Sequence, residues 1–255
     1  MRILLTNDDG VTSPGICLLA KALREAGHKV IVVAPDTNRS GCSHSIQFLS
    51  GPLKLTEIEK DTYSCSGTPV DCVIVSLLGG IPELDISTEG NDLNMAKAPD
   101  LVLSGINAGA NLGTDINYSG TASAARQGSF FGIPSVALSL VENDDDWKWN
   151  SVISFIIENL LTFVGYWKAG SFVNVNFPNI EKNPSAIVPV FHSMRYYNDR
   201  IVRFSDPEGR IYCFAKPGKA ENKPEPGSDW AEVLNNNAAL TVVNAQPVCF
   251  KEQGG

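Results

Sequence analysis

Two adjacent acidic residues, Asp8 and Asp9, follow the first apolar run of the chain, and Gly10 comes directly after them. The run over residues 3–5 reads Ile-Leu-Leu and predicts a short buried strand. Neighbouring carboxylates repel each other, which raises the cost of keeping both ionised. A positive charge beside them would offset that cost, so we expect Asp8 and Asp9 to bind a cation.

Polar loops follow the other apolar segments of this half of the chain. The loop over residues 36–43 contains Ser40, Asn107 follows a strand-like stretch, and residues 117–123 mark a predicted helix N-terminus. In open α/β sheets, ligands bind outside the carboxyl ends of the strands. We therefore expect all four loops to lie at one edge of a sheet.

These loops offer the hard oxygen ligands that Mg²⁺ and Mn²⁺ prefer. We expect Asp8 and Asp9 to supply charge, and Ser40 and Asn107 to supply neutral oxygens. A metal ion with few protein ligands keeps positions at which a water is activated and a phosphoryl oxygen is polarised. The predicted reaction is hydrolysis of a phosphate monoester, with Asp8 or Asp9 as the general base.

The substrate is expected to contact the glycine-bearing loops and the helix N-terminus. Glycines allow backbone amides to approach an anion, and a helix N-terminus favours phosphate. The expected substrate-binding residues are Asn38, Gly41, Asn111, Ser119, Gly120 and Thr121.

Each of these signals also has a purely structural interpretation. Asp-Asp-Gly after a strand is often a turn with a helix cap, and the glycines of residues 104–109 could mark a tight turn. His44 lies close to Ser40, so a role in proton transfer stays open. The functional interpretation is favoured because the signals coincide at successive strand ends.

Other classes of nucleotide enzyme lack their motifs in this sequence. No G-x-x-x-x-G-K-[ST] occurs, and the first strand is not followed by G-x-G-x-x-G, which disfavours a P-loop enzyme and an NAD-dependent oxidoreductase. No Ser-His-Asp order supports a triad hydrolase. A module that binds a nucleotide without hydrolysing it is the alternative, although a pure anion receptor would gain from losing the two aspartates.

The elements that must position these residues alternate along the chain. Continuous apolar strands are predicted over 28–35, 99–107 and 132–140, and an alternating one over 172–178. Helices are predicted over 13–27, 70–80, 120–132 and 152–164. This order predicts a doubly wound α/β fold with a mostly parallel, Rossmann-like sheet.

The last quarter of the chain has a different character. We predict an α/β core over residues 1–180 and a C-terminal, β-rich extension over 181–255, in which strand-like segments flank a turn-rich stretch. The extension is too polar for a strong core of its own, so we expect it to pack on the core or to reach a partner subunit.

Composition excludes some partners and locations. The net charge of −8 argues against binding to duplex nucleic acid, and no apolar segment reaches the length of a membrane span. No secretion signal is evident at the N-terminus, and no C-x-x-C pair suggests zinc. We expect a cytoplasmic protein.

Several blocks of this sequence together resemble the SurE family of metal-dependent 5′/3′-nucleotidases. They include "MRILLTNDDGV", "APDTNRSG", "LVLSGINAGANLGTDINYSGTASAA" and "VNVNFP", and the resemblance covers most of residues 1–180. It implies that Asp8, Asp9, Ser40 and Asn107 hold the divalent metal. It also implies nucleoside monophosphates as substrates, short polyphosphates in some members, and homodimers or homotetramers that exchange C-terminal segments.

The sequence departs from the family pattern in two places. Residues 87–99 are longer than the bacterial pattern and resemble a eukaryotic, plant-like branch. The C-terminal extension matches weakly beyond "GRIYCFAKPG" and "GSDWAEV". Both departures bear on base preference and assembly.

Overall fold

The computed structural model describes residues 1–87, 92–142 and 146–248, so part of the expected loop at 87–99 lies outside the described residues. Within these ranges, nine strands form one sheet and two more form a separate hairpin. In spatial order the strands of the large sheet are β3 (Leu55–Glu59), β4 (Thr62–Cys65), β2 (Lys29–Pro35), β1 (Arg2–Thr6), β5 (Leu101–Ala108), β6 (Ser135–Leu140), β7 (Ser171–Phe177), β11 (Ala238–Asn244) and β8 (Ile187–Pro189). Strands from β4 to β7 run parallel, whereas β3 pairs antiparallel with β4 and β11 pairs antiparallel with β7. The edge strand β8 pairs parallel with β11. The predicted doubly wound, mostly parallel sheet is confirmed.

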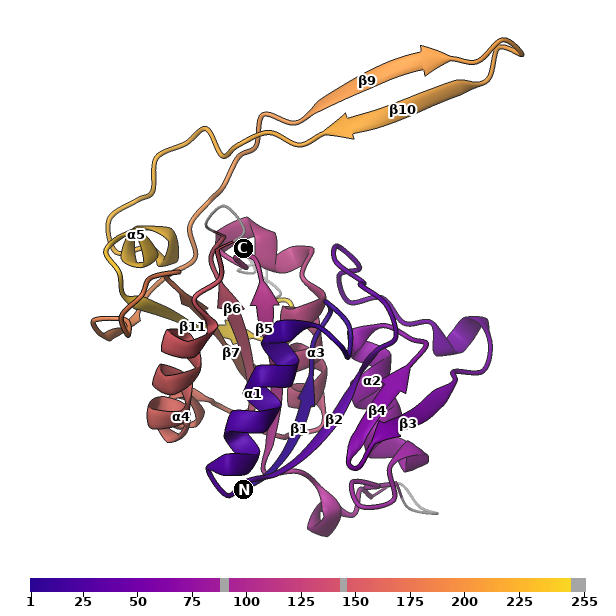
Figure 1. Ribbon diagram of the computed structural model, residues 1–255, viewed down its shortest axis with the longest axis vertical. Helices are drawn as coiled ribbons and strands as arrows, with labels where there is room; N and C mark the ends of the chain where they lie inside the picture. Colours follow the sequence, from indigo (N-terminus) through magenta and orange to yellow (C-terminus); the bar gives the residue numbers. More distant parts are fainter. Residues whose placement is uncertain (88–91, 143–145, 249–255) are drawn as a thin grey trace, which may run out of the picture.

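Helices cover both faces of this sheet (Figure 1). On one face lie α1 (Pro14–Glu25) and α4 (Trp149–Tyr166), and on the other lie α2 (Pro69–Val75) and α3 (Gly120–Phe130). Successive residues of β1 therefore enter different cores: Ile3 and Leu5 pack in the core beneath α1 and α4, and Leu4 packs in the core beneath α2. Burial on both faces explains why the strand is apolar throughout.

The helices begin and end close to their sequence signals. Pro14 occupies the first turn of α1, and Gly27 follows its end with φ at +86°. The helix predicted over 152–164 is found as α4, which spans Trp149–Tyr166. Along the described parts of the chain, no helix combines the length and hydropathy that crossing a bilayer requires.

Apolar and polar residues alternate along β7, but this strand does not have one face in water. Alternating apolar and polar residues are typical of a strand with one face in water, yet every residue of β7 is buried. The amides of Asn174 and Asn176 donate to the backbone carbonyl of Asn111, each over 3.0 Å, and Oδ1 of Asn176 accepts from the Asn111 N–H at 2.8 Å. The polar face of β7 therefore anchors the loop that follows β5.

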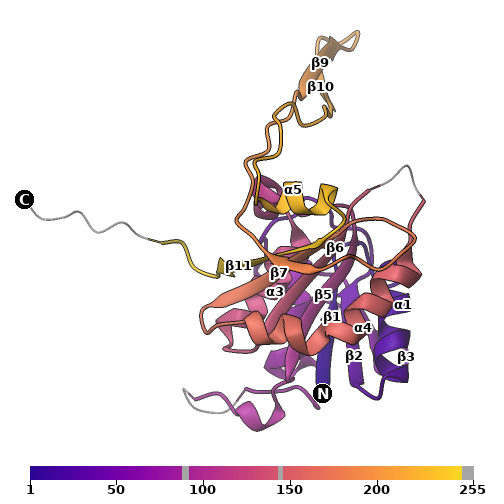
Figure 2. The same cartoon turned by 90° about the vertical axis from the view of Figure 1, so that its left-hand side faces the viewer.

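The described residues beyond 180 form three parts of the structure. Strands β8 and β11 extend the large sheet, and the short helix α5 (Asp229–Leu234) packs against β11 and β7. The remaining strands, β9 (Arg200–Ser205) and β10 (Ile211–Lys216), form a hairpin that projects away from the body in both views (Figures 1 and 2). We call residues 200–216 the arm. Thus the extension both packs on the core and reaches outward.

We predict that Asn176→Ala lowers the free energy of unfolding by about 2–3 kcal/mol, because it leaves the buried N–H of Asn111 without its acceptor. Urea denaturation followed by circular dichroism measures the change. Asn150→Ala, at an exposed position of α4, is the control and should change stability by less than about 0.5 kcal/mol. Equal losses in the two variants would contradict the anchoring role.

Candidate active site

The turn after β1 presents the two adjacent carboxylates. Asn7 is buried and closes this turn: its Nδ2 donates to the Gly10 carbonyl at 3.0 Å, and its Oδ1 accepts from the Gly10 N–H at 3.2 Å. Gly10 has φ at +105°, a conformation that disfavours any side chain. The backbone between them therefore turns sharply and leaves Asp8 and Asp9 at the carboxyl end of the strand.

Asp8 is held by the N-terminus of α3. Its Oδ1 accepts from the Thr121 hydroxyl at 2.6 Å and its Oδ2 accepts from the Gly120 N–H at 3.1 Å, while Ser119 caps the helix by accepting from the Ala122 N–H. A Cβ at Gly120 would lie 2.8 Å from the Asp8 Cβ, so the helix approaches this closely only with glycine there. Donors that were expected to bind phosphate thus bind a carboxylate.

Asp9 is half-buried and is held by the loop after β5. Its Oδ2 accepts from the Ala108 N–H at 3.0 Å. The pairing of β5 with β6 shifts register between Ser104 and Asn107, which breaks the regular course of β5 just before the site. Asn107 donates through Nδ2 to the Gly109 carbonyl at 2.9 Å, and its Oδ1 has no hydrogen bond within the described ranges.

The loop after β2 closes the site from the other side. The Arg39 N–H donates to the Asp8 carbonyl at 2.7 Å, and the Ser43 N–H donates to the Tyr118 carbonyl at 3.0 Å. The Ser40 N–H donates to Oδ1 of Asn38 at 2.7 Å, and both side chains are exposed, as is Gly41. The loops that carry Asp8, Ser40, Asn107 and Thr121 therefore converge, as expected from strand order.

The two carboxylates lack a basic partner. Among the described residues, no Lys or Arg side chain forms an ion pair with Asp8 or Asp9. Burial raises the pKa of Asp8 above its usual value, against the hydrogen bonds from Thr121 and Gly120. Burial, with the neighbouring charge of Asp8, raises the pKa of Asp9 to about 6. Two crowded carboxylates, an amide oxygen and a hydroxyl form a donor set that suits a hard divalent cation.

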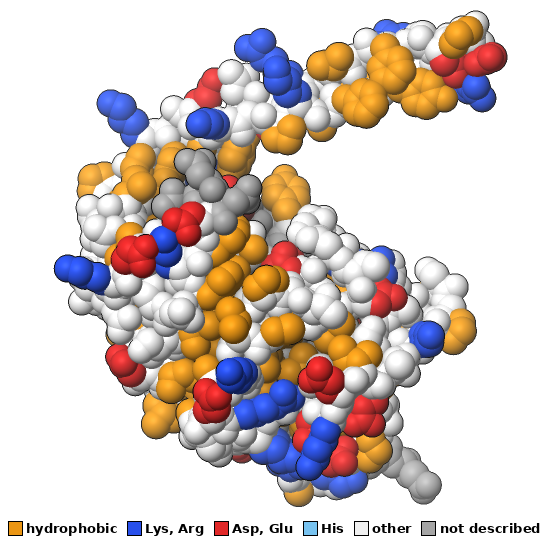
Figure 3. Space-filling view, in the orientation of Figure 1, with side chains coloured by type: hydrophobic (Ala, Val, Ile, Leu, Met, Phe, Trp, Pro, Cys, Tyr) orange, Lys and Arg blue, Asp and Glu red, His pale blue; other side chains and the backbone are white. Residues whose placement is uncertain are grey.

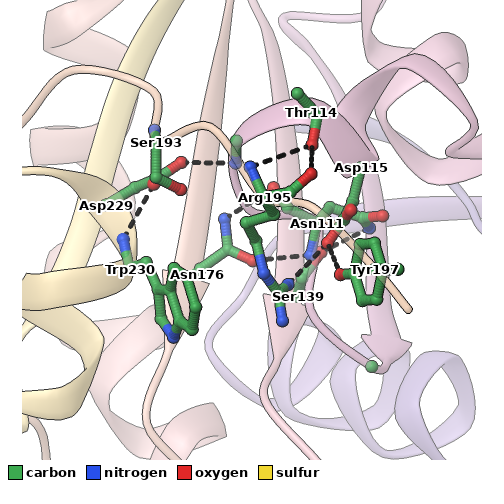
Figure 4. A network of polar contacts seen from close by, with 12 residues as sticks. Asn111, Thr114, Asp115, Ser139, Asn176, Ser193, Arg195, Tyr197, Asp229 and Trp230 are labelled. Atoms are coloured by element: carbon green, nitrogen blue, oxygen red, sulfur yellow. Dashed lines mark hydrogen bonds and ion pairs between the residues drawn. The ribbon is translucent and has the colours of Figure 1, made fainter. Parts of the chain in front are cut away.

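Two of the residues considered from sequence have other contacts. Asn111 is buried and donates through Nδ2 to the Ser139 hydroxyl at 2.8 Å, so its contacts join the loop to β6 and β7 (Figure 4). His44 contacts Gln127 of α3, with 3.0 Å between Nε2 and Oε1, and its ring packs against Phe130. Burial lowers the pKa of His44.

A polar cluster that the sequence patterns did not predict joins the core to the C-terminal residues (Figure 4). Arg195 forms an ion pair with Asp115, and Asp229 accepts from the Gly113 N–H at 2.7 Å and the Ser193 N–H at 2.9 Å. These contacts tie residues 193–195 and α5 to the loop after β5. The partners lie 36, 80 and 116 positions apart, and no spacing rule connects them.

The family model described as "Survival protein SurE" matches residues 3–198. A protein from Paramagnetospirillum magneticum named 5′-nucleotidase SurE is 36% identical over 98% of this chain and 90% of its own length. A protein of the same name from Xanthomonas campestris is 38% identical over 96% of this chain and 90% of its own length. The crystal structure of the SurE protein from Aquifex aeolicus superposes with a TM-score of 0.80 at 34% identity, covering 97% of this chain and 95% of that one. These relatives are bacterial, and they give no support to the expected plant-like branch.

We predict that Asp9→Asn raises the thermal stability of the protein in EDTA at pH 8. The carboxyl has a higher pKa in the folded protein, about 6, than its ordinary 3.8, so the folded state binds more protons between these values and stability falls as pH rises through them. Asparagine removes this penalty, and we expect a melting temperature about 2–6 °C higher at pH 8, with a smaller gain at pH 4.5.

Differential scanning fluorimetry at both pH values makes the comparison. Asp61→Asn is the matched control, because Asp61 lies in a turn with φ at +57°, which asparagine tolerates. A variant of Asp9 that melts below the wild type at pH 8 would show that the carboxylate is not under electrostatic stress.

Proposed function

The chain belongs to the SurE family, and on that premise we propose that it is a 5′-nucleotidase that hydrolyses nucleoside 5′-monophosphates with a divalent metal ion. The observation that carries this proposal is the adjacent pair of buried Asp8 and half-buried Asp9, which has no basic partner within the described ranges. The relatives named 5′-nucleotidase cover nearly the whole chain, which supports an enzyme of this class. From the family resemblance we further propose 3′-monophosphates and short polyphosphates as additional substrates, and a cytoplasmic location.

Asp8, Asp9, Ser40 and Asn107 would hold the metal, either Mg²⁺ or Mn²⁺. When bound, the ion would offset the charge of the substrate phosphate and lower the pKa of a water molecule. Asp8 uses both carboxylate oxygens to accept hydrogen bonds from α3, so its orientation is fixed. Ser40 and Asn107 leave oxygen atoms without hydrogen bonds in the described part of the chain.

The remaining site residues divide into two groups. Asn38 and Gly41 lie on the exposed loop beside the carboxylates and are proposed to contact the substrate. Ser119, Gly120 and Thr121 are proposed to act by holding Asp8, and Asn111 by holding the loop after β5. We propose Asp9 as the general base, because its Oδ1 accepts no hydrogen bond within the described residues.

We also propose that the protein is a homodimer or homotetramer assembled through the arm. Val202, Phe204, Tyr212 and Phe214 share one face of this hairpin, and the rings of Phe204 and Phe214 stack at 5.3 Å. Phe214 is 62% exposed, and Figure 3 shows hydrophobic side chains gathered along the arm. A two-stranded hairpin is at best marginally stable in water by itself. A second copy of the chain that covers this face would stabilise it.

We predict that the purified protein releases phosphate from 5′-AMP and 5′-GMP with Mg²⁺ or Mn²⁺ and not with EDTA. Asp8→Asn should lower kcat/KM at least about 100-fold, because it removes one of two charges from the proposed metal site. Asp61→Asn, in a turn outside the site, should stay within about threefold of wild type. A malachite green assay measures free phosphate, and nucleotide binding without phosphate release would instead identify a sensing module.

For the oligomer, we predict that Phe214→Ser reduces the mass of the protein in solution to that of a monomer. Cys213→Ser is the control, because Cys213 neighbours Phe214 in β10 and its side chain points to the opposite face of the hairpin. Size-exclusion chromatography with light scattering measures both. The proposal fails when the wild type is monomeric or when Phe214→Ser keeps the wild-type mass.

A further inference from the structure

A cavity of about 370 Å³ lies between the loop after β5, the end of β6, α5 and residues 193–197, which we call the root of the arm. This volume is in the range of sites for small molecules. Asp115, Arg195, Tyr197 and Trp230 line it from three separate segments, and Figure 4 shows these side chains gathered around one another. Glu142 and Leu234 also line the cavity.

The cavity begins beside the candidate active site. A Cβ at Gly109 would lie 3.2 Å from Oε1 of Glu142 and 3.6 Å from Nδ2 of Asn107, so these two atoms are less than about 7 Å apart. The residue before Gly109, Ala108, donates its N–H to Asp9. Glu142 therefore lies between the proposed metal site and the aromatic side chains of the cavity.

The aromatic end of the cavity is preorganised. The Arg195 guanidinium lies 5.0 Å from the centre of the Trp230 ring and 5.3 Å from the centre of the Tyr197 ring. Asp115 fixes the positions of Arg195 and Tyr197. It forms an ion pair with Arg195 and accepts a hydrogen bond from the Tyr197 hydroxyl at 2.7 Å. Asp115 is therefore satisfied within the protein, and flat surfaces of the kind on which nucleobases stack are fixed in place.

Glu142 differs from Asp115 in having no such partners. Its side chain is exposed, and within the described residues it forms no hydrogen bond or ion pair. In addition, Nε of Arg195 is buried without an acceptor among those residues. One free carboxylate thus faces a cavity with aromatic walls, and one unsatisfied donor lies buried in a residue of its lining.

We propose that this cavity binds the nucleoside part of the substrate, with the ribose hydroxyls donating to Glu142 and the base packed against Tyr197, Arg195 and Trp230. The ribose of a nucleoside monophosphate joins the phosphate to the base, and Glu142 likewise lies near Asn107 and lines the cavity that holds the aromatic cluster. A carboxylate that accepts from two neighbouring hydroxyls selects ribose over deoxyribose. The inference rests on the proposed nucleotidase activity and assigns its ribose and base specificity to these residues.

The ribose contact is tested with 5′-AMP and 2′-deoxy-5′-AMP as paired substrates. We expect the wild type to favour 5′-AMP at least about fivefold in kcat/KM and Glu142→Gln to reduce this preference to less than about twofold, mainly through KM. The matched control is Glu158→Gln, an exposed glutamate of α4 that should keep the wild-type preference. A wild type without the preference, or a Glu142→Gln variant that retains it, would overturn the ribose assignment.

The base contact is tested by filling the cavity. Leu234 is 62% exposed, so Leu234→Trp adds bulk at the wall without disturbing the core. We expect the ratio of kcat/KM for 5′-AMP to that for ribose 5-phosphate to fall at least about tenfold. Leu161→Trp, at a 73% exposed position of α4, should leave this ratio unchanged.

An unchanged ratio in Leu234→Trp would overturn the base assignment. This outcome differs from failure of the proposed function, in which the wild type with Mg²⁺ or Mn²⁺ releases phosphate from neither 5′-AMP nor ribose 5-phosphate.

Discussion

The crowding of two carboxylates, Asp8 and Asp9, is the constraint on which the rest of this structure depends. Asp8 is 3% exposed, and within the described ranges neither acid has a basic partner. Burial of an uncompensated charge is costly. The fold reduces that cost for Asp8 with donors from α3 and leaves Asp9 with a single backbone donor from the loop after β5. The site is thus electrostatically incomplete, and the cation proposed above would complete it.

Close backbone approach at a few positions makes this arrangement possible. Gly10 allows the chain to turn after the aspartates, and Gly120 lets the end of α3 lie against Asp8. On the other side, Asn174 and Asn176 use buried amides to hold the backbone of Asn111. Buried polar side chains that donate to or accept from the backbone, rather than apolar packing alone, therefore set the position of the loops around the two acids.

The C-terminal residues complete the surroundings of the site as well as reaching away from it. Asp229 accepts hydrogen bonds from Gly113 and Ser193, so α5, the root of the arm and the loop after β5 are joined through one buried carboxylate. Hydrogen bonds keep the pKa of Asp229 low despite its burial. The walls of the proposed nucleoside cavity thus depend on contacts between the loop after β5, in the middle of the chain, and residues beyond 190, and the arm extends from the same root.

The sequence alone predicted most elements of the core and the loops that meet at the candidate site. Apolar runs, Pro14 and Gly27 marked strands and helix ends, because periodicity and capping are local properties, and strand order brought Asp8, Ser40, Asn107 and Thr121 to one edge. Only the tertiary structure decided what the polar side chains contact. Residues 172–178 alternate between apolar and polar side chains, yet the asparagines of β7 are buried, because they hydrogen-bond to the backbone of the loop after β5 that lies against them. Likewise, Asp115 meets Arg195 only through folding, since contacts between residues so far apart leave no periodic trace in the sequence.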